Sequence, residues 1–164
     1  MARRSVDRGE ARCVGIWNRS AAKAQEAADV RARMSQICDE IIEPGSREET
    51  IEAVRELQQG GVGKLIAAGG DGTINAVVNA LAPLDDPPVL GIVPLGTAND
   101  LCCSLAIPDD PQLALQLIEQ GPVQPLDAIQ VIAAEGDWWY INMATGGNSA
   151  RVTEELTDEL KQRW

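Results

Sequence analysis

Two short apolar segments in the middle of the chain each run directly into a polar loop that contains glycine. Residues 64–68 (KLIAA) precede the loop Gly69–Thr73 (GGDGT), and residues 89–93 (VLGIV) precede the loop Pro94–Asp100 (PLGTAND). Apolar runs of this length, bounded by turn residues, are typical of buried strands in a parallel sheet. Helical patterns follow both loops, so we expect the chain to alternate strands with helices.

Apolar spacing and the residues that start or stop helices predict the remaining elements. Ser46 and Glu49 form the S-x-x-E pattern of a helix start, and Asp110-Pro111 opens another helix. A turn at Glu135-Gly136-Asp137 would join the last two strands as a hairpin. Strands are predicted over residues 13–17, 128–132 and 138–144, and helices over 21–38, 46–60, 74–81, 111–121 and 151–164, with a short helix from Leu101.

The apolar residues also indicate which side of each helix faces the sheet. The fold class that follows is α/β: a Rossmann-like open, mostly parallel sheet with helices on both faces. We expect one α/β domain over residues 1–137, with a disordered tail over 1–11, and the start of a second domain over 138–164. The expected inward side chains are Val30, Met34, Ile37, Ile41, Ile51, Val54, Leu57, Leu113, Leu117 and Ile118.

The composition excludes several classes of function. The net charge of −11 excludes a nucleic-acid partner, because such a partner demands a basic face. The chain has no His, so catalysis by a Ser-His or Cys-His pair is excluded. Its four cysteines lack zinc spacing and are expected to be small buried residues. No apolar run resembles a membrane span or signal peptide, so we expect a cytoplasmic protein.

The loop Gly69–Thr73 has the chemistry of a phosphate cradle. Its glycines let an anion approach the backbone, and the next helix offers free N–H groups and the positive end of its dipole. Thr73 would cap that helix or donate to a phosphate oxygen, with Asn75 beside it. Asp71 would accept loop amides, hold a nucleotide hydroxyl or bind Mg²⁺. The alternative for Asp71 is a tight turn in which it bonds its own backbone.

The PLGTAND loop adds a second polar edge. Gly96 admits a tight turn, and Thr97 and Asn99 place a hydroxyl and an amide at the carboxyl end of the strand. Asp100 would cap the helix that follows. Because the carboxyl ends of parallel strands lie at one edge of a sheet, we expect both loops to meet there and bind a nucleotide.

Four motifs carry a resemblance to a known family. They are GGDGTIN at Gly69–Asn75, GIVPLGTANDL at Gly91–Leu101, LDAIQV at Leu126–Val131 and INMATGG at Ile141–Gly147. With them the sequence resembles the diacylglycerol kinase catalytic domain family, and most closely its bacterial YegS-type lipid kinases. GGDGT alone is shared with NAD kinases and loosely with phosphofructokinases, whereas PLGTAND favours the lipid kinases. INMATGG resembles the start of that family's second domain.

The resemblance implies transfer of the γ-phosphoryl group of ATP, with Mg²⁺, to the hydroxyl of a diacylglycerol-like lipid. ATP and a lipid would be the partners, with peripheral membrane contact and no transmembrane segment. Asp71 is the loop carboxylate that we nominate as catalytic, and no metal ligand is assigned. The nucleotide would be bound by Asn18, Gly69, Gly70, Asp71, Gly72, Thr73, Asn75, Gly96, Thr97 and Asn99.

The sequence departs from the family pattern in four places. Ala76 replaces the usual Glu, Asn18-Arg19-Ser20-Ala21 replaces a loop with Asn-Pro and Ser-Gly, and residues 41–45 lack a Thr. The chain also stops at Trp164, before the β-rich second domain that holds the family's general base, its metal ligands and much of its lipid site. We therefore expect this fragment alone to be inactive.

The last predicted helix carries an apolar stripe of Val152, Leu156, Leu160 and Trp164. This stripe would pack on the α/β domain itself or pair with a second copy of the chain. Two other functions stay open: an NAD kinase relative, and a non-catalytic nucleotide-binding or interaction module.

Overall fold

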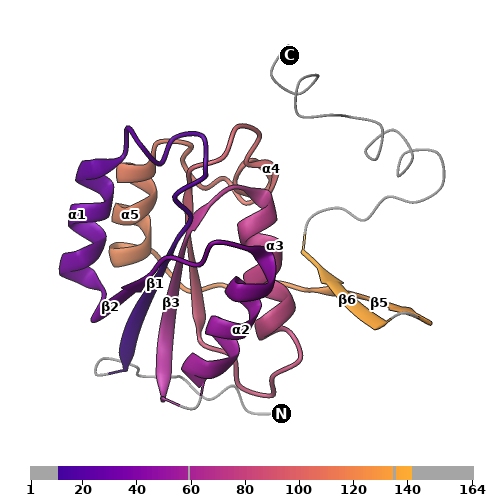
Figure 1. Ribbon diagram of the computed structural model, residues 1–164. Helices are drawn as coiled ribbons and strands as arrows, with labels where there is room; N and C mark the ends of the chain where they lie inside the picture. The colour runs from indigo at the N-terminus through magenta and orange to yellow at the C-terminus, as the bar shows by residue number, and fades with distance from the viewer. Residues whose placement is uncertain (1–10, 59, 135, 142–164) are drawn as a thin grey trace.

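A parallel sheet of four strands forms the centre of the protein in the computed structural model (Figure 1). The structure describes residues 11–58, 60–134 and 136–141. The strand order is β2-β1-β3-β4, and every neighbouring pair is parallel. The four strands are β1 (Arg12–Trp17), β2 (Glu40–Ile42), β3 (Val62–Gly69) and β4 (Val89–Pro94).

Helices cover both faces of this sheet. The larger ones are α1 (Ala28–Ile37), α2 (Arg47–Gln58), α3 (Asp71–Leu81) and α5 (Pro111–Gln120), and α4 is a short helix at Asp100–Ser104. Helices α1 and α5 lie on one face, and α2 and α3 lie on the other (Figure 1). The predicted open α/β fold is therefore confirmed.

Strand β3 shows how the sequence builds this two-sided core. Successive side chains of a strand point to opposite faces. Leu65 and Ala67 accordingly pack in the cluster that contains α2 and α3, whereas Ile66 and Ala68 pack in the cluster that contains α1 and α5. All four side chains are buried, which explains why this segment is a continuous apolar run rather than an alternating one.

The strand order fixes where a ligand can bind. The chain passes from β1 to β2 on one side and then returns to β3 on the other side of β1. In open α/β sheets, ligands bind outside the carboxyl ends of the strands at such a change of direction. The loops after β1 and β3 meet at this point, and Asn18 N donates to the carbonyl of Ala68 (2.9 Å).

The first helix is shorter than predicted, and one strand was missed. Helix α1 begins at Ala28 rather than Ala21 and ends at Ile37, where Cys38 turns to extended backbone. Ile41 therefore lies in β2, paired with Gly15 of β1, and not on a helix face. The Ala-rich composition favoured a long helix, and a three-residue edge strand leaves no clear periodicity in sequence.

The buried side of α5 also differs from the prediction. Ala114 and Leu115 are buried and Ile118 packs beside them, whereas Leu113 and Leu117 are exposed. Ile118 lies against Gly91 of β4, because a Cβ added there would meet its side chain at 3.0 Å. Leu113 and Leu117 do lie on one side of the helix, but that side is turned away from the sheet.

Both predicted helix starts are confirmed. The Ser46 hydroxyl accepts the amide of Glu49 (3.0 Å), and the Glu49 carboxylate accepts the amide of Gly45 (2.7 Å). At α5 the Asp110 carboxylate accepts the amides of Gln112 and Leu113.

A separate two-stranded sheet lies beyond the core, made of β5 (Ile129–Ala133) and β6 (Gly136–Tyr140). The two strands are antiparallel, as the predicted hairpin requires, but β6 begins at residue 136 rather than 138. The predicted domain border at 137/138 falls inside β6, and the division into two domains stays a prediction. The predicted tail over 1–11, apart from Ala11, the strand end beyond 141 and the helix over 151–164 lie outside the described residues.

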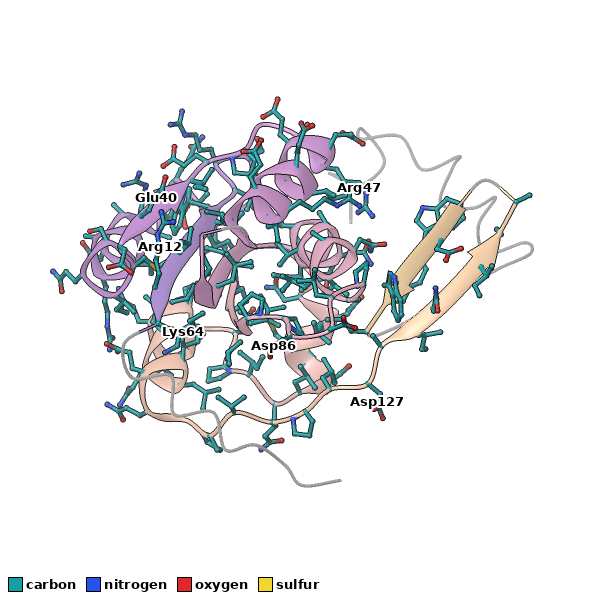
Figure 2. All side chains as sticks on the ribbon, turned by 90° about the horizontal axis from the view of Figure 1, so that it is seen from below. Arg12, Glu40, Arg47, Lys64, Asp86 and Asp127 are labelled. Atoms are coloured by element: carbon teal, nitrogen blue, oxygen red, sulfur yellow. The ribbon has the colours of Figure 1, made fainter. Side chains whose placement is uncertain are left out.

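Ion pairs on the surface link the elements around the sheet. Arg12 of β1 pairs with Glu40 of β2 at the sheet edge (Figure 2). No helix within the described ranges is long and apolar enough to cross a membrane.

Candidate functional site

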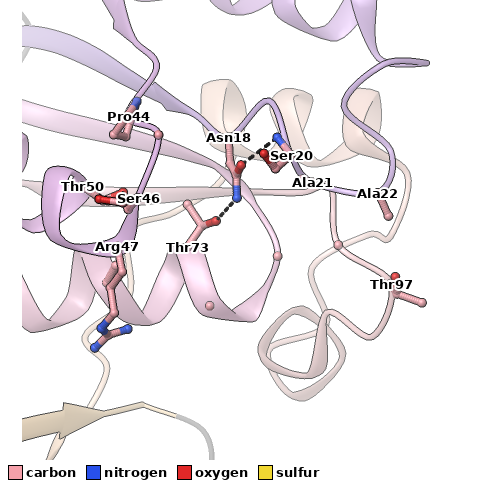
Figure 3. A pocket seen from close by; sticks show the side chains of 15 residues that line it. Asn18, Ser20, Ala21, Ala22, Pro44, Ser46, Arg47, Thr50, Thr73 and Thr97 are labelled. Carbon is pink, nitrogen blue, oxygen red and sulfur yellow. Dashed lines mark hydrogen bonds between the residues drawn. The ribbon is translucent and has the colours of Figure 1, made fainter. Parts of the chain in front are cut away.

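A cleft of about 810 Å³ lies at the carboxyl ends of the four parallel strands (Figure 3). Each strand contributes the loop that follows it, so residues far apart in the sequence share one cavity. The lining residues are Asn18, Ser20, Ala21, Ala22, Pro44, Gly45, Ser46, Arg47, Thr50, Gly70, Gly72, Thr73, Ala76, Gly96 and Thr97.

The start of α3 presents free backbone amides beside this cleft. Gly70 is the N-cap residue of α3, and because it has no side chain it makes no side-chain capping bond to the first amides of the helix. Its carbonyl accepts the amides of Thr73 and Ile74, which leaves the amides of Asp71 and Gly72 without a partner among the described residues. Free N–H groups at the positive end of a helix are a suitable environment for an anion. Helix α3 begins at Asp71, three residues before the predicted start at Ile74.

Glycine is required where the two loops touch each other. A Cβ added at Gly96 would lie 2.6 Å from Cα of Gly70, and one added at Gly70 would lie 3.1 Å from Cα of Gly96. A Cβ at Gly69 would meet the Thr73 hydroxyl at 2.5 Å. The backbones of GGDGT and PLGTAND are therefore in direct contact, and a side chain at Gly96 would push them apart.

Thr73 and Asn18 join the loops after β3 and β1. The Asn18 side-chain amide donates to the Thr73 hydroxyl (2.8 Å), and its carbonyl accepts the amide of Ser20 (2.9 Å) (Figure 3). Thr73 is buried, with 9% of its surface exposed. The hydroxyl does not cap α3, so that prediction for Thr73 was wrong, but it lies at the wall of the cleft.

Asp71 connects the two glycine-bearing loops. Its carboxylate accepts the amide of Leu101 in the first turn of α4 (3.3 Å). It thereby caps α4, whereas Asp100, the predicted cap, is itself the first helical residue. Asp71 lines a smaller hollow with Asn75 and Ile141 rather than the main cleft. Acceptance of a loop amide is one of the roles that its position in the sequence predicts.

Asn99 holds the PLGTAND loop in shape. Its backbone is left-handed (φ 51°, ψ 44°), a conformation that Asn tolerates better than most residues. Its side chain accepts the amide of Gly96 (3.0 Å) and donates to the Gly96 carbonyl (3.0 Å) and to Asp109 (2.8 Å). Only 3% of Asn99 is exposed. These bonds occupy the side chain within the loop, and a direct contact with a nucleotide stays a prediction.

Asn75 and Asn79 connect α3 to the hairpin. The Asn79 side chain donates to the carbonyl of Trp139 (2.9 Å) and accepts its amide (2.9 Å), as a neighbouring strand would. Asn75 donates to the same carbonyl (3.2 Å). Asn75 therefore lies on the hairpin side of α3 rather than in the cleft lining, and its role in nucleotide binding stays a prediction.

The cleft brings together most of the predicted residues and adds others that the motifs did not indicate. Asn18, Gly70, Gly72, Thr73, Gly96 and Thr97 line it, whereas Gly69, Asp71, Asn75 and Asn99 are not among the lining residues. The segment Pro44–Arg47 and Thr50 were missed. The S-x-x-E pattern at Ser46 marks a helix start just after β2, which could have indicated these residues, but β2 itself was not predicted.

Two carboxylates fix the loops around the cleft. Arg31 and then Arg19 hold the pKa of Glu43 below its usual value, and this pairing joins α1 and the loop after β1 to the end of β2. Lys23, followed by Asn99, likewise lowers the pKa of Asp109, through hydrogen bonds of 2.7 and 2.8 Å. The described residues contain no group of three or more metal-ligating side chains.

The fold and the cleft define an open α/β domain with a cleft at the carboxyl edge of its sheet. The chain belongs to the diacylglycerol kinase catalytic domain family, whose sequence model matches residues 13–131. The family expected from the motifs is thereby confirmed.

Relatives of this family are similar over the same part of the chain. The chain is 48% identical over 110 residues to a probable lipid kinase YegS-like of Cronobacter sakazakii, and 49% identical over 110 residues to that of Serratia proteamaculans. These alignments cover 66% of the chain and 36% and 35% of the relatives, so the chain spans about a third of their length. A crystal structure of a diacylglycerol kinase from Bacillus anthracis superimposes with a TM-score of 0.64 at 27% identity, over 71% of this chain and 44% of that one.

Proposed function

We propose that the chain binds ATP in the cleft and supplies the nucleotide-binding part of a lipid kinase. The observation that carries the proposal is the start of α3, where the amides of Asp71 and Gly72 have no partner among the described residues and Gly72 faces open space. The reaction would transfer the γ-phosphoryl group of ATP to a lipid hydroxyl. Such a transfer asks a protein mainly for positioning and for neutralisation of charge.

Each loop has a distinct task in this proposal. Gly70, Gly72 and Thr73 would bind the phosphates, with the Thr73 hydroxyl held in place by Asn18. Thr97 and Gly96 would bind from the opposite loop. Asp71 would keep the two loops at the right separation through its bond to Leu101, and its nomination as the catalytic residue stays a prediction.

Mg²⁺ would enter this site as a companion of the nucleotide, since the described residues that line the cleft include no carboxylate. Magnesium usually keeps several waters and binds through one or two carboxylates together with substrate phosphates, rather than in a cage of protein ligands. The described residues offer no such cage, and Asp71 is the carboxylate nearest to the phosphate loop in sequence. Bound Mg²⁺ would neutralise charge on the phosphates, and we expect it to enter with ATP.

The proposal extends to partners in line with the lipid kinase names of the relatives. The acceptor would be a lipid, which the protein would reach from the cytoplasm by peripheral contact with a membrane. Pairing of two copies of the chain through residues 151–164 stays part of the hypothesis. Two other functions remain as outcomes of the tests: an NAD kinase relative, and a non-catalytic nucleotide-binding or interaction module.

The experiment is a calorimetric titration of the chain with MgATP, MgADP and NAD, for the natural sequence and for Asp71→Ala. We expect MgATP and MgADP to bind and Asp71→Ala to bind more weakly, because the variant releases the Leu101 amide and loosens the contact between the loops. Circular dichroism would establish that both proteins are folded. Binding of NAD in preference to ATP would favour the NAD kinase relative, and binding of neither would favour the interaction module.

A second measurement follows the phosphoryl group. The chain would be incubated with γ-labelled ATP, Mg²⁺ and vesicles that contain diacylglycerol, with NAD as the alternative acceptor. We expect no robust labelling of lipid by this chain alone, because it spans only about a third of the length of the lipid kinases that it matches. Label on NAD would contradict the lipid kinase assignment.

A further inference from the structure

Among the described residues that line the cleft, Arg47 is the one with a charged side chain. It is the first residue of α2, directly after the Ser46 cap, and its side chain is exposed. In Figure 3, Arg47 and Thr97 lie at opposite ends of the cleft, with Thr73 between them. In Figure 2, Arg47 lies on the side of the molecule toward β5 and β6, away from the Arg12–Glu40 pair.

The position of Arg47 is electrostatically unfavourable for the folded protein. A cation at the first residue of a helix faces the positive end of the helix dipole, where Asp and Glu are preferred. Glu48 and Glu49 follow it in the same turn, as that preference predicts, and the Glu49 carboxylate accepts the Gly45 amide. The start of α3, with its free amides, adds a second positive helix end to the same cleft.

No ion pair compensates Arg47 within the described residues. Most other arginines there are paired: Arg12 with Glu40, Arg19 and Arg31 with Glu43, and Arg33 with Glu119. Arg55, in the last turn of the same helix, is also without an ion pair, but there the helix dipole favours a cation. Arg47 therefore has neither a partner nor a favourable helix position, in a chain whose net charge is −11.

We propose that Arg47 binds a phosphate group of the nucleotide in this cleft. The inference rests on the proposed function and deepens it, because it names the side chain that offsets the acidic field of the protein at the site. A guanidinium group offers several N–H donors in a planar fork that matches phosphate oxygens. The phosphate would then lie between Arg47 and the amides at the start of α3. The unfavourable position of Arg47 in the free protein is relieved when the anion is bound.

Arg55 supplies a matched control for the test. Arg47→Ala, Arg47→Glu and Arg55→Ala would each be titrated with MgATP, MgADP, adenosine and glycerol 3-phosphate, and their melting temperatures measured without ligand. We expect Arg47→Ala to bind MgATP about tenfold more weakly or worse, with adenosine binding unchanged, since a charged hydrogen bond to phosphate is lost. Arg47→Glu should lose more, and Arg55→Ala should bind like the natural sequence.

The melting temperatures give a readout that a structural role would not produce. Arg47→Ala and Arg47→Glu should melt at the same temperature as the natural chain or higher, because they remove a cation from a helix N-terminus. Arg55→Ala should melt at the same temperature or slightly lower. Weaker MgATP binding at undiminished stability supports the proposal.

Other outcomes would overturn it in distinguishable ways. MgATP affinity in Arg47→Ala equal to that of the natural chain would contradict the role of Arg47 and leave the proposed function standing. An equal loss for adenosine would mean a contact with the base instead. A loss for glycerol 3-phosphate without one for MgATP would assign Arg47 to a lipid headgroup. Failure of the natural chain to bind any nucleotide would overturn the proposed function itself.

Discussion

The two glycine-bearing loops at the edge of the sheet use their polar groups in opposite ways. GGDGT leaves the amides of Asp71 and Gly72 open beside the cleft. PLGTAND instead closes on itself, because the Asn99 side chain binds both backbone groups of Gly96. The comparison teaches that GGDGT presents backbone groups to a ligand, whereas much of PLGTAND serves to hold its own backbone in shape.

The contact between Gly96 and Gly70 is what makes the two loops interdependent, so a change there should have the largest effect. Gly96→Ala places a Cβ 2.6 Å from Cα of Gly70 and 2.8 Å from the Asn99 side chain. We expect a loss of about 1–3 kcal/mol in the free energy of unfolding, as for other overpacked sites. Urea denaturation would measure it. An unchanged midpoint would show that the loops are not in rigid contact.

Asn99 tests whether the second loop is held by its own side chain. Asn99→Ala loses the bonds to Gly96 and Asp109 and also places Ala in a left-handed conformation. We expect a loss of roughly 2 kcal/mol in unfolding free energy, measured by thermal or urea denaturation.

Asn99→Gly is the matched control, because Gly adopts the left-handed conformation freely. Its unfolding free energy should lie between those of the natural chain and Asn99→Ala. Equal stabilities of Asn99→Gly and the natural chain would mean that the side-chain bonds contribute nothing and that only the left-handed backbone conformation matters at this position.

A change at Asn79 tests the hairpin contact of α3 independently of the cleft, because Asn79 bonds to Trp139 and does not line the cleft. Asn79→Asp replaces the donor that faces the Trp139 carbonyl with a second acceptor. The Trp139 amide keeps its acceptor, but the part-buried bond to the Trp139 carbonyl, worth about 1 kcal/mol or more, is lost. We expect the loosened hairpin to exchange hydrogen at the Trp139 amide about tenfold faster. MgATP affinity should stay unchanged. An equal loss of affinity would show that the hairpin takes part in the nucleotide site.

The smallest expected effect is a loss of unfolding free energy at acid pH, because protonation of Glu43 weakens its ion pairs with Arg31 and Arg19. The pKa of Glu43 is lowered, so its pairing with Arg31 and Arg19 is fully present above the ordinary value of 4.5. As pH falls below that value, the unfolded state takes up the proton first, and stability is lost until the folded carboxyl is also protonated. Glu43→Gln should flatten the stability profile at pH values below the ordinary carboxyl pKa of 4.5. An unchanged profile would contradict this assignment.

The sequence allowed the sheet and one wall of the cleft to be predicted, because those features are local. An apolar run that ends in GGDGT signals both a strand and the start of α3, and S-x-x-E signals the start of α2. Strand β2 was missed because three residues show no periodicity. As a result, the segment Pro44–Arg47, which follows β2 and lines the cleft, was not predicted to belong to the site.

The roles of the asparagines could not be read from the motifs. Asn75, Asn79 and Asn99 occur in or near the two loops, yet their partners lie up to 64 residues away in sequence, as Asn75 and Trp139 do. The sequence alone does not distinguish a polar residue that faces a ligand from one that bonds to another segment of the chain. Only the fold assigns Asn99 to its own loop and Asn79 to the hairpin.

The measurement that tests the central claim most directly is the MgATP affinity of Gly72→Ala, taken together with its melting temperature. A Cβ at Gly72 would meet no atom within 4 Å, and Ala is favoured over Gly inside a helix by about 0.5–1 kcal/mol. We therefore predict an equal or higher melting temperature but MgATP binding that is about tenfold weaker, because the methyl group occupies space that the phosphates need. Undiminished MgATP affinity in this stable variant would contradict the assignment of the start of α3 as the phosphate site.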